Sequence, residues 1–106
     1  MKIEEISSVQ IDTLRRAAEY ILGCWDWESP TLFGLSKEEF GAACIAKLNT
    51  VEAEAAFIRV GHSSLNEMLN GARALSSEQI EATLGVTSAQ ASALSNEISS
   101  LFPGEF

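Results

Sequence analysis

Residues 24–35 read CWDWESPTLFGL and contain both tryptophans of the protein, Trp25 and Trp27. Pro30 lacks a backbone N–H, and it disfavours helical geometry at the preceding residue, Ser29. We therefore predict an irregular segment here. The sequence on both sides of it has the periodicity of helices.

The two tryptophans are separated by one residue, Asp26, and are followed by Glu28. In an extended segment both rings would point to one side and both carboxylates to the other. Tryptophan buries a large apolar area, so at least one ring is expected in the core. Tryptophan is also frequent among the residues that dominate protein–protein binding, and adjacent charges add orientation and association rate. The sequence is compatible with a core or an interface position for each ring.

Two further carboxylates, Glu38 and Glu39, begin the next helix, where acidic residues favour the first turn. Together with the tryptophan segment they would form a local acidic cluster. We predict a partner-binding site made of these six residues: Trp25, Asp26, Trp27, Glu28, Glu38 and Glu39.

A first helix is predicted from Ser8, as its cap, to about Leu22, with Gly23 as a left-handed stop. Its apolar residues recur at steps of three and four, which places them on one helical face. They are Ile11, Leu14, Ala18, Ile21 and Leu22.

The clearest start signal in the chain is a capping box of Ser36 and Glu39, flanked by Leu35 and Phe40 as a hydrophobic staple. A second helix is predicted to begin there. Its apolar face carries Phe40, Ala43, Cys44 and Leu48.

Asn49 and Glu52 form a second capping box, so the chain is predicted to turn there and to start a third helix that stops at Gly61. A single bent helix across residues 36–60 is the alternative.

Three more capping boxes predict three short helices in the second half of the chain. The paired residues are Ser64 and Glu67, Ser76 and Gln79, and Thr87 and Gln90. Glycine-containing turns are predicted to end these helices at Asn70-Gly71, Leu84-Gly85 and Pro103-Gly104. No window alternates with the period of a strand. We therefore predict an all-α fold, a compact bundle of about five to six short helices in a single domain spanning residues 1–106, with an irregular Trp-rich segment after the first helix.

Residues 76–98 resemble the helix-turn-helix motif. The family's apolar positions and turn glycine correspond to Ile80, Leu84, Gly85, Val86, Ala91 and Leu94. The resemblance implies two helices joined by a tight glycine turn. A DNA-reading helix also needs basic residues for phosphates, but residues 75–106 contain no lysine or arginine, and Glu81 stands where the family usually has a small residue. We predict an architectural helix pair without direct nucleic-acid contact.

No catalytic or metal-binding pattern stands out. The one histidine, His62, precedes Ser63-Ser64 and could be a base beside a serine, but a histidine after a glycine is more typical of a turn. One histidine and two cysteines do not supply the four ligands of a zinc site. Asp26 and Glu28 lack the remainder of a calcium loop. We predict neither an enzyme nor a cofactor or metal.

The formal net charge is −8 and 46% of the residues are hydrophobic, which is typical of an acidic globular protein. Such a chain repels phosphate backbones and anionic membranes and attracts basic partners. There is no apolar run long enough to span a membrane, and the N-terminal Met-Lys-Ile-Glu-Glu does not predict a signal peptide. Two cysteines in a chain with an ordinary core fit a reducing cytoplasm.

These features lead to the hypothesis of a small cytoplasmic inhibitor or neutralising protein that binds a basic protein, such as a nuclease or another nucleic-acid-binding protein. Its size and charge are similar to those of bacterial immunity proteins and of phage-encoded inhibitors of nucleic-acid machinery. The alternatives are a small helix-turn-helix regulator and a non-inhibitory adaptor subunit. The sequence is compatible with a monomer or a homodimer.

Overall fold

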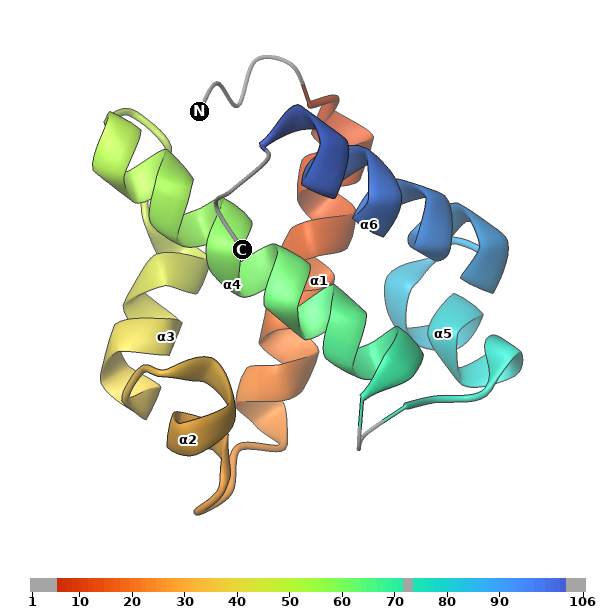
Figure 1. Cartoon of the computed structure of the whole chain (residues 1–106), viewed down its shortest axis with the longest axis horizontal. Coiled ribbons are helices and arrows are strands. Elements are labelled where there is room, and N and C mark those ends of the chain that lie inside the picture. Colours follow the sequence, from red (N-terminus) through yellow and green to blue (C-terminus); the bar gives the residue numbers. More distant parts are fainter. Residues whose placement is uncertain (1–5, 72–73, 103–106) are drawn as a thin grey trace.

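The computed structural model describes residues 6–71 and 74–102, and within these ranges the chain forms six helices and no strand (Figure 1). The predicted all-α bundle is therefore confirmed. The helices are α1 (Ser8–Gly23), α2 (Ser29–Phe33), α3 (Lys37–Ile45), α4 (Val51–Asn70), α5 (Ser77–Leu84) and α6 (Ser88–Leu101).

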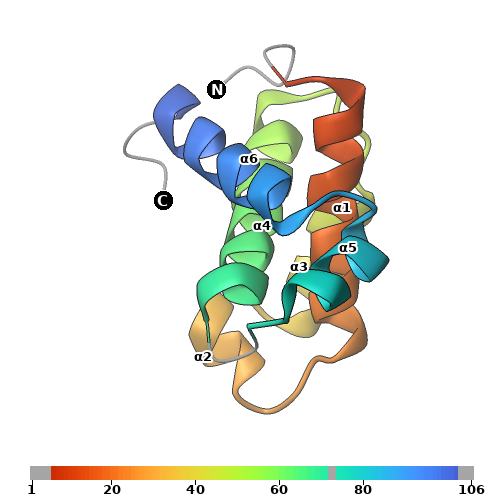
Figure 2. The same cartoon turned by 90° about the vertical axis from the view of Figure 1, so that its right-hand side faces the viewer.

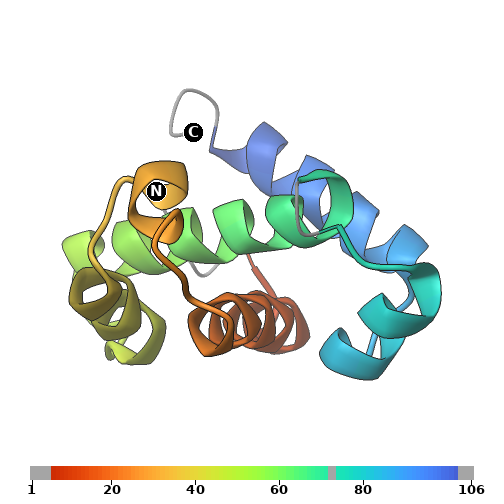
Figure 3. The same ribbon diagram turned by 90° about the horizontal axis from the view of Figure 1, so that it is seen from below.

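The centre of the molecule is the crossing of α1 and α4. Figure 3 shows α4 running across the molecule, with α1 seen nearly end-on against it. A Cβ on Gly61 would lie only 2.9 Å from the Cβ of Leu14, so the two backbones approach more closely than any other residue at this position would allow. The prediction that Gly61 ends a helix is therefore wrong. The small size of Gly61 instead allows α1 and α4 to cross closely.

The other helices flank this crossing on two sides. In Figure 1, α2 and α3 lie on the left and α5 and α6 on the right. The buried apolar residues of both sides belong to one core cluster, which includes Phe40 from α3, Ile80 from α5 and Ile98 from α6. The central pair α1 and α4 therefore positions both flanks.

Local capping signals set most of the helix starts. The predicted capping boxes form at Ser36–Glu39, Ser76–Gln79 and Thr87–Gln90, with each side chain bonded to the other residue's backbone N–H. The predicted turn at Gly85 is also confirmed, with a left-handed φ of 76°. The predicted stop at Pro103-Gly104 lies outside the described residues.

Two caps lie one residue away from their predicted positions. Ser7, not Ser8, caps α1, because Gln10 completes a capping box with it. Thr50, not Asn49, caps α4, accepting from the N–H of Ala53 at 3.1 Å. The chain thus forms two helices across residues 36–60, not one bent helix.

The predicted helix start at Ser64 and Glu67 is wrong, because α4 continues without a break to Asn70. Ser64 is fully buried in the middle of this helix. Its Oγ has no hydrogen-bond partner among the described residues. Packing against the core thus overrides a local signal here. The predicted end at Asn70-Gly71 is confirmed.

A partly buried contact connects α1 to α3. The Nε of Arg15 donates to the carbonyl of Cys44 at 3.2 Å, and the guanidinium lies 4.9 Å from the ring centroid of Phe57. Burial disfavours the thiolate and raises the pKa of Cys44 to about 11. Cys24 is exposed, and both thiols are free.

Candidate functional site

Three aromatic rings support the segment that follows α1. Trp25 is half-buried, with its ring stacked on Phe33 at 5.9 Å between centroids and tilted against Phe40 at 4.9 Å. The centroids of Phe33 and Phe40 are 5.2 Å apart. Each such pair contributes about 0.5–1.5 kcal/mol beyond the burial of area. The cluster therefore fixes the base of the segment to α2 and α3.

Asp26 holds the next turn of the chain. Its Oδ1 accepts from the backbone N–H groups of Glu28 at 2.9 Å and Ser29 at 3.2 Å, and from the Oγ of Ser29 at 3.2 Å. The backbone N–H of Asp26 in turn donates to the Oγ of Ser29 at 3.1 Å. Ser29 is fully buried. The carboxylate of Asp26 therefore has a structural role in the turn.

The prediction that Pro30 keeps this segment non-helical is wrong, because Ser29–Phe33 forms the short helix α2. Pro30 lies in its first turn, where a backbone N–H has no acceptor within the helix, so its absence costs nothing. The bonds to Asp26 hold Ser29 in helical geometry against the usual preference before proline. Within the predicted irregular segment, residues 24–28 and 34–35 lie outside helices.

The two tryptophans point in different directions, contrary to the predicted shared side. Trp25 packs inward, whereas Trp27 is 86% exposed. The reason is that residues 26–29 turn rather than extend, so the alternation of a strand does not apply. We call residues Trp25–Ser29 the Trp27 loop.

Trp27 is the most exposed of the large apolar side chains in the described chain. Ile45, at 81%, and Val9, at 67%, are also exposed, and single exposed apolar residues are common on protein surfaces. Trp27 differs from them because it is larger and is carried by a turn that the Asp26 bonds and the aromatic cluster hold in one conformation. Half-exposed Leu32, on the adjoining α2, adds apolar surface that the sequence did not single out.

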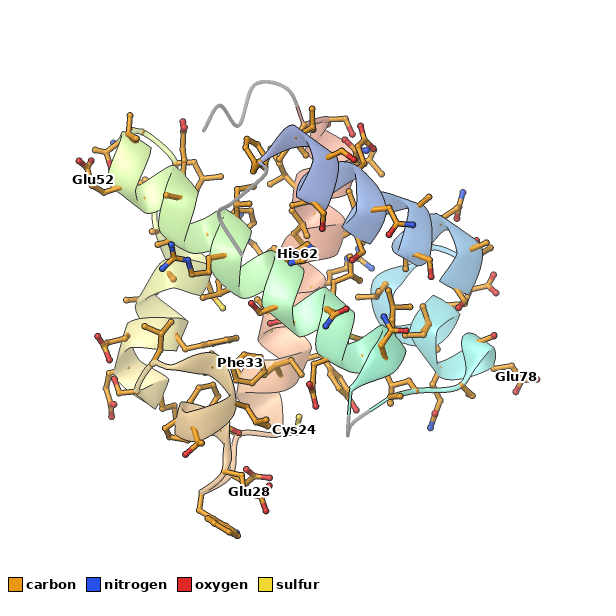
Figure 4. The ribbon with its side chains drawn as sticks, viewed as in Figure 1. Cys24, Glu28, Phe33, Glu52, His62 and Glu78 are labelled. Carbon is orange, nitrogen blue, oxygen red and sulfur yellow. The ribbon has the colours of Figure 1, made fainter. Side chains whose placement is uncertain are left out.

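The four candidate carboxylates fall into two groups. Asp26 and Glu39 bond to the protein's own backbone, and the bond from Ser36 N–H at 2.9 Å lowers the pKa of Glu39. Glu28 and Glu38 are exposed, and their side chains form no hydrogen bond or ion pair with any residue that the structure describes. Figure 4 shows Glu28 at the lower tip of the molecule. Of the four, Glu28 and Glu38 are therefore the carboxylates that the described backbone does not already engage.

The structure joins the two parts of the predicted site through one residue. Phe40 follows Glu39 in α3, and its ring contacts Trp25. The Trp27 loop and the first turn of α3 are thus packed on the same aromatic cluster. Lys37, also in that first turn, is exposed and offsets part of the negative charge.

His62 lies within α4 rather than in a turn, and it faces serines of α6 rather than its sequence neighbours. Its Nε2 is 3.0 Å from the Oγ of Ser99, and that hydroxyl donates its proton to the carbonyl of Ser95. The Oγ of Ser95 also lies 3.5 Å from this nitrogen. His62 thus connects α4 to α6 through two serine hydroxyls, and which atom donates depends on the tautomer of the ring. Burial lowers its pKa.

No metal site is evident in the described ranges, since no three His, Cys, Asp or Glu side chains lie close enough to hold an ion. The oxygen Oδ1 of Asp26, which the sequence pairs with Glu28 as a potential calcium ligand, is bonded within the Trp27 loop.

The pair α5 and α6 has the shape that the helix-turn-helix resemblance implies, with Gly85 in the turn. Its surface carries carboxylates at Glu78, Glu81 and Glu97, all exposed, and residues 74–102 include no lysine or arginine. In Figure 4, Glu78 lies on the side of the molecule away from Glu28. The negative charge is therefore spread over both flanks.

Comparison with protein-family models, with curated proteins and with solved structures found no match for this chain. Within residues 6–71 and 74–102, no helix combines the length and apolar character needed to cross a bilayer. What the protein does is therefore inferred from its own geometry and charge.

Proposed function

We propose that the protein binds a basic partner protein through the Trp27 loop and the first turn of α3, and inhibits or neutralises that partner by covering its positively charged surface. Trp27 would be the anchor. Glu28 and Glu38 would supply the charges that meet lysine or arginine on the partner.

The observation that carries this proposal is the 86% exposure of Trp27 on a turn with fixed hydrogen bonds. An exposed tryptophan offers roughly 150–250 Å² of surface for burial in a complex. A pre-formed turn loses little conformational entropy on binding, which leaves more of that energy for affinity. These properties support an anchor role more than a core role for Trp27.

The net charge of −8 supports a basic partner. Opposite charge speeds encounter and selects against wrong partners, and both effects weaken with salt. Because Asp26 and Glu39 are engaged in backbone bonds, we assign the electrostatic role to Glu28 and Glu38.

A pull-down from the native host, followed by binding measurements with the purified partner, tests the proposal. We expect the wild type to retain a basic protein and Trp27→Ala to bind it at least about 30-fold more weakly, as for a binding hot spot. Ile45→Ala is the matched control, since Ile45 is nearly as exposed but lies at the end of α3. Glu28→Gln with Glu38→Gln should lower the association rate and reduce its dependence on salt.

Equal retention by Trp27→Ala and the wild type would refute the anchor role. An affinity unmoved both by salt and by the double glutamine variant would refute the electrostatic role. The two halves of the proposal can therefore fail separately.

The formation of α5 and α6 around Gly85 favours one alternative, a helix-turn-helix regulator. It would have to bring Glu78, Glu81 and Glu97 near phosphates without a compensating cation in residues 74–102. Retention on a heparin or DNA column at physiological salt would support this alternative, and flow-through would exclude it. A non-inhibitory adaptor would instead bind its partner without changing the partner's activity.

A further inference from the structure

A groove lies between the first half of α1 and α6, away from the Trp27 loop. Its walls include Val9 and Thr13 from α1, Val86 from the connection after α5, and Ala93 and Leu94 from α6. In Figure 2, α6 and the first half of α1 flank that connection. The groove holds about 250 Å³, which is below the roughly 300–1,000 Å³ of small-molecule sites and suits a single side chain.

The lining is mostly apolar, with one fixed carboxylate at its edge. Val9 is 67% exposed at the groove although it is a large apolar residue. Gln10 donates from Nε2 to the Oε2 of Glu97 at 2.8 Å, while its Oε1 accepts from the N–H of Ser7. The Gln10 side chain is thus held by the cap of α1, and it holds Glu97 in turn.

The charges around the groove indicate the kind of occupant. Glu97 borders it, and residues 74–102, which supply Val86, Ala93 and Leu94 to its walls, contain no lysine or arginine. The Arg16 side chain approaches the α5–α6 turn, but it is paired with Asp12 at 2.9 Å. An apolar side chain flanked by lysine or arginine would therefore be favoured.

The same charges exclude one occupant that the molecule itself could supply. A second copy could offer its exposed Trp27, but that ring is flanked by Asp26 and Glu28. These carboxylates would approach Glu97, and like charges in such a contact are unfavourable. A partner of opposite charge fits better than a second copy.

We propose that this groove is a second binding site, which receives one aliphatic or aromatic side chain of a peptide segment flanked by lysine or arginine. The site does not depend on the Trp27 loop. It gives the protein a receiving surface on its α5–α6 flank in addition to the projecting anchor of its α2–α3 flank.

The test is a titration of the isotope-labelled full-length protein with the synthetic peptide Lys-Arg-Leu-Lys-Arg, followed by amide NMR shifts. We expect saturable shifts at Val86, Ala93 and Leu94 and none at the Trp27 indole. Replacing the central leucine by alanine should weaken binding about 10-fold, since a buried leucine contributes through its apolar area. A Glu-Glu-Leu-Glu-Glu peptide should not bind.

Three variants separate the groove from other surfaces. Ala93→Met, at an exposed position, fills the groove without a change in charge and should abolish the shifts at Val86. Val9→Thr keeps the shape but adds a hydroxyl, and should weaken binding several-fold. Trp27→Ala should bind the peptide like the wild type, so failure of this site is distinguishable from failure of the Trp27 anchor.

Equal binding of the leucine and alanine peptides would overturn the proposal, because it would reveal attraction by charge alone. Shifts that persist in a folded Ala93→Met protein would also overturn it. So would concentration-dependent self-association that Ala93→Met abolishes, because the occupant would then be a second copy.

Discussion

The two ends of α1 present apolar surface in opposite ways. After Gly23 the chain turns outward and projects Trp27, whereas near Ser8 the helix lines a groove together with α6. A helix of 16 residues separates these ends by about 24 Å. On the two proposals above, one end would insert a side chain into a partner and the other would receive one. Since each end is fixed by its own local contacts, single substitutions should affect them separately.

The largest expected effect is at Phe40, which lies under the Trp27 loop. Phe40→Ala removes a fully buried ring that contacts both Trp25 and Phe33, and should lower the free energy of unfolding by about 3–5 kcal/mol. Urea denaturation followed by circular dichroism measures it. Leu32→Ala, on the half-exposed side of α2, is the control and should cost less than about 1 kcal/mol. Similar losses for both variants would contradict a central role of the aromatic cluster.

Gly61→Ala should destabilise the structure at both ends of α1, because the added methyl group separates α4 from α1. The new Cβ would lie 2.9 Å from that of Leu14, so we expect a net loss of about 1–2 kcal/mol despite the better helix propensity of alanine. Gly41→Ala is the matched control, since the nearest atom, of Leu22, is 3.7 Å away. That variant should be neutral or gain up to about 1 kcal/mol. Effects of the same sign in the two variants would argue against a tight helix crossing.

Asp26→Ala should loosen only the Trp27 end. It removes the acceptor for the N–H groups of Glu28 and Ser29, and we expect a cost of about 0.5–2 kcal/mol, as for a lost helix cap. The order parameter of the Trp27 indole N–H should fall while the shifts of Val86 in the groove stay unchanged. Glu28→Gln, at an exposed side chain, should change stability by less than about 0.5 kcal/mol. A Trp27 indole that is equally ordered in both variants would disprove the claim that the Asp26 hydrogen bonds order the Trp27 loop.

The smallest effect should be a pH dependence confined to the α6 side. Burial lowers the pKa of His62 below the ordinary 6.5, so the unfolded chain takes up its proton at a higher pH than the folded protein. The stability from neutral His62 is complete above about pH 6.5 and falls as the pH drops toward the folded pKa. Urea midpoints on both sides of this pH should differ in the wild type and not in His62→Gln. Glu39, whose pKa is lowered from 4.5, titrates below this window.

The sequence correctly predicted features that depend on contacts between residues three or four positions apart. The boxes at Ser36, Ser76 and Thr87 formed because each cap and its partner lie within one turn. Gly61 and Ser64 also gave local signals, but Gly61 lies at the close crossing with α1 and Ser64 is fully buried, and α4 runs through both. Among these predictions, those that rest on residues close together in the chain were confirmed, whereas those at positions determined by residues distant in the chain were wrong.

The candidate site shows the same division. The segment and its residue types could be read from the sequence, but the separation of Trp25 from Trp27 depends on Phe33 and Phe40, which lie beyond the turn. The role of Asp26 was open to prediction, since aspartate three residues before a serine at a helix start is a local capping pattern. The groove could not be predicted from the sequence, because Val9 lies off the apolar face of its helix and lines a groove only through the tertiary arrangement of α1 and α6.

The two thiols differ in accessibility, so the rates at which they are alkylated can report transient separation of α3 from α1. Cys44 is fully buried with a pKa of about 11, so in the native state it is both shielded and almost entirely protonated at neutral pH, whereas Cys24 stands at the surface. An alkylating reagent should therefore modify one cysteine quickly and the other only when α3 comes away from α1. The ratio of the two rates, read by mass spectrometry, would report how often that separation occurs.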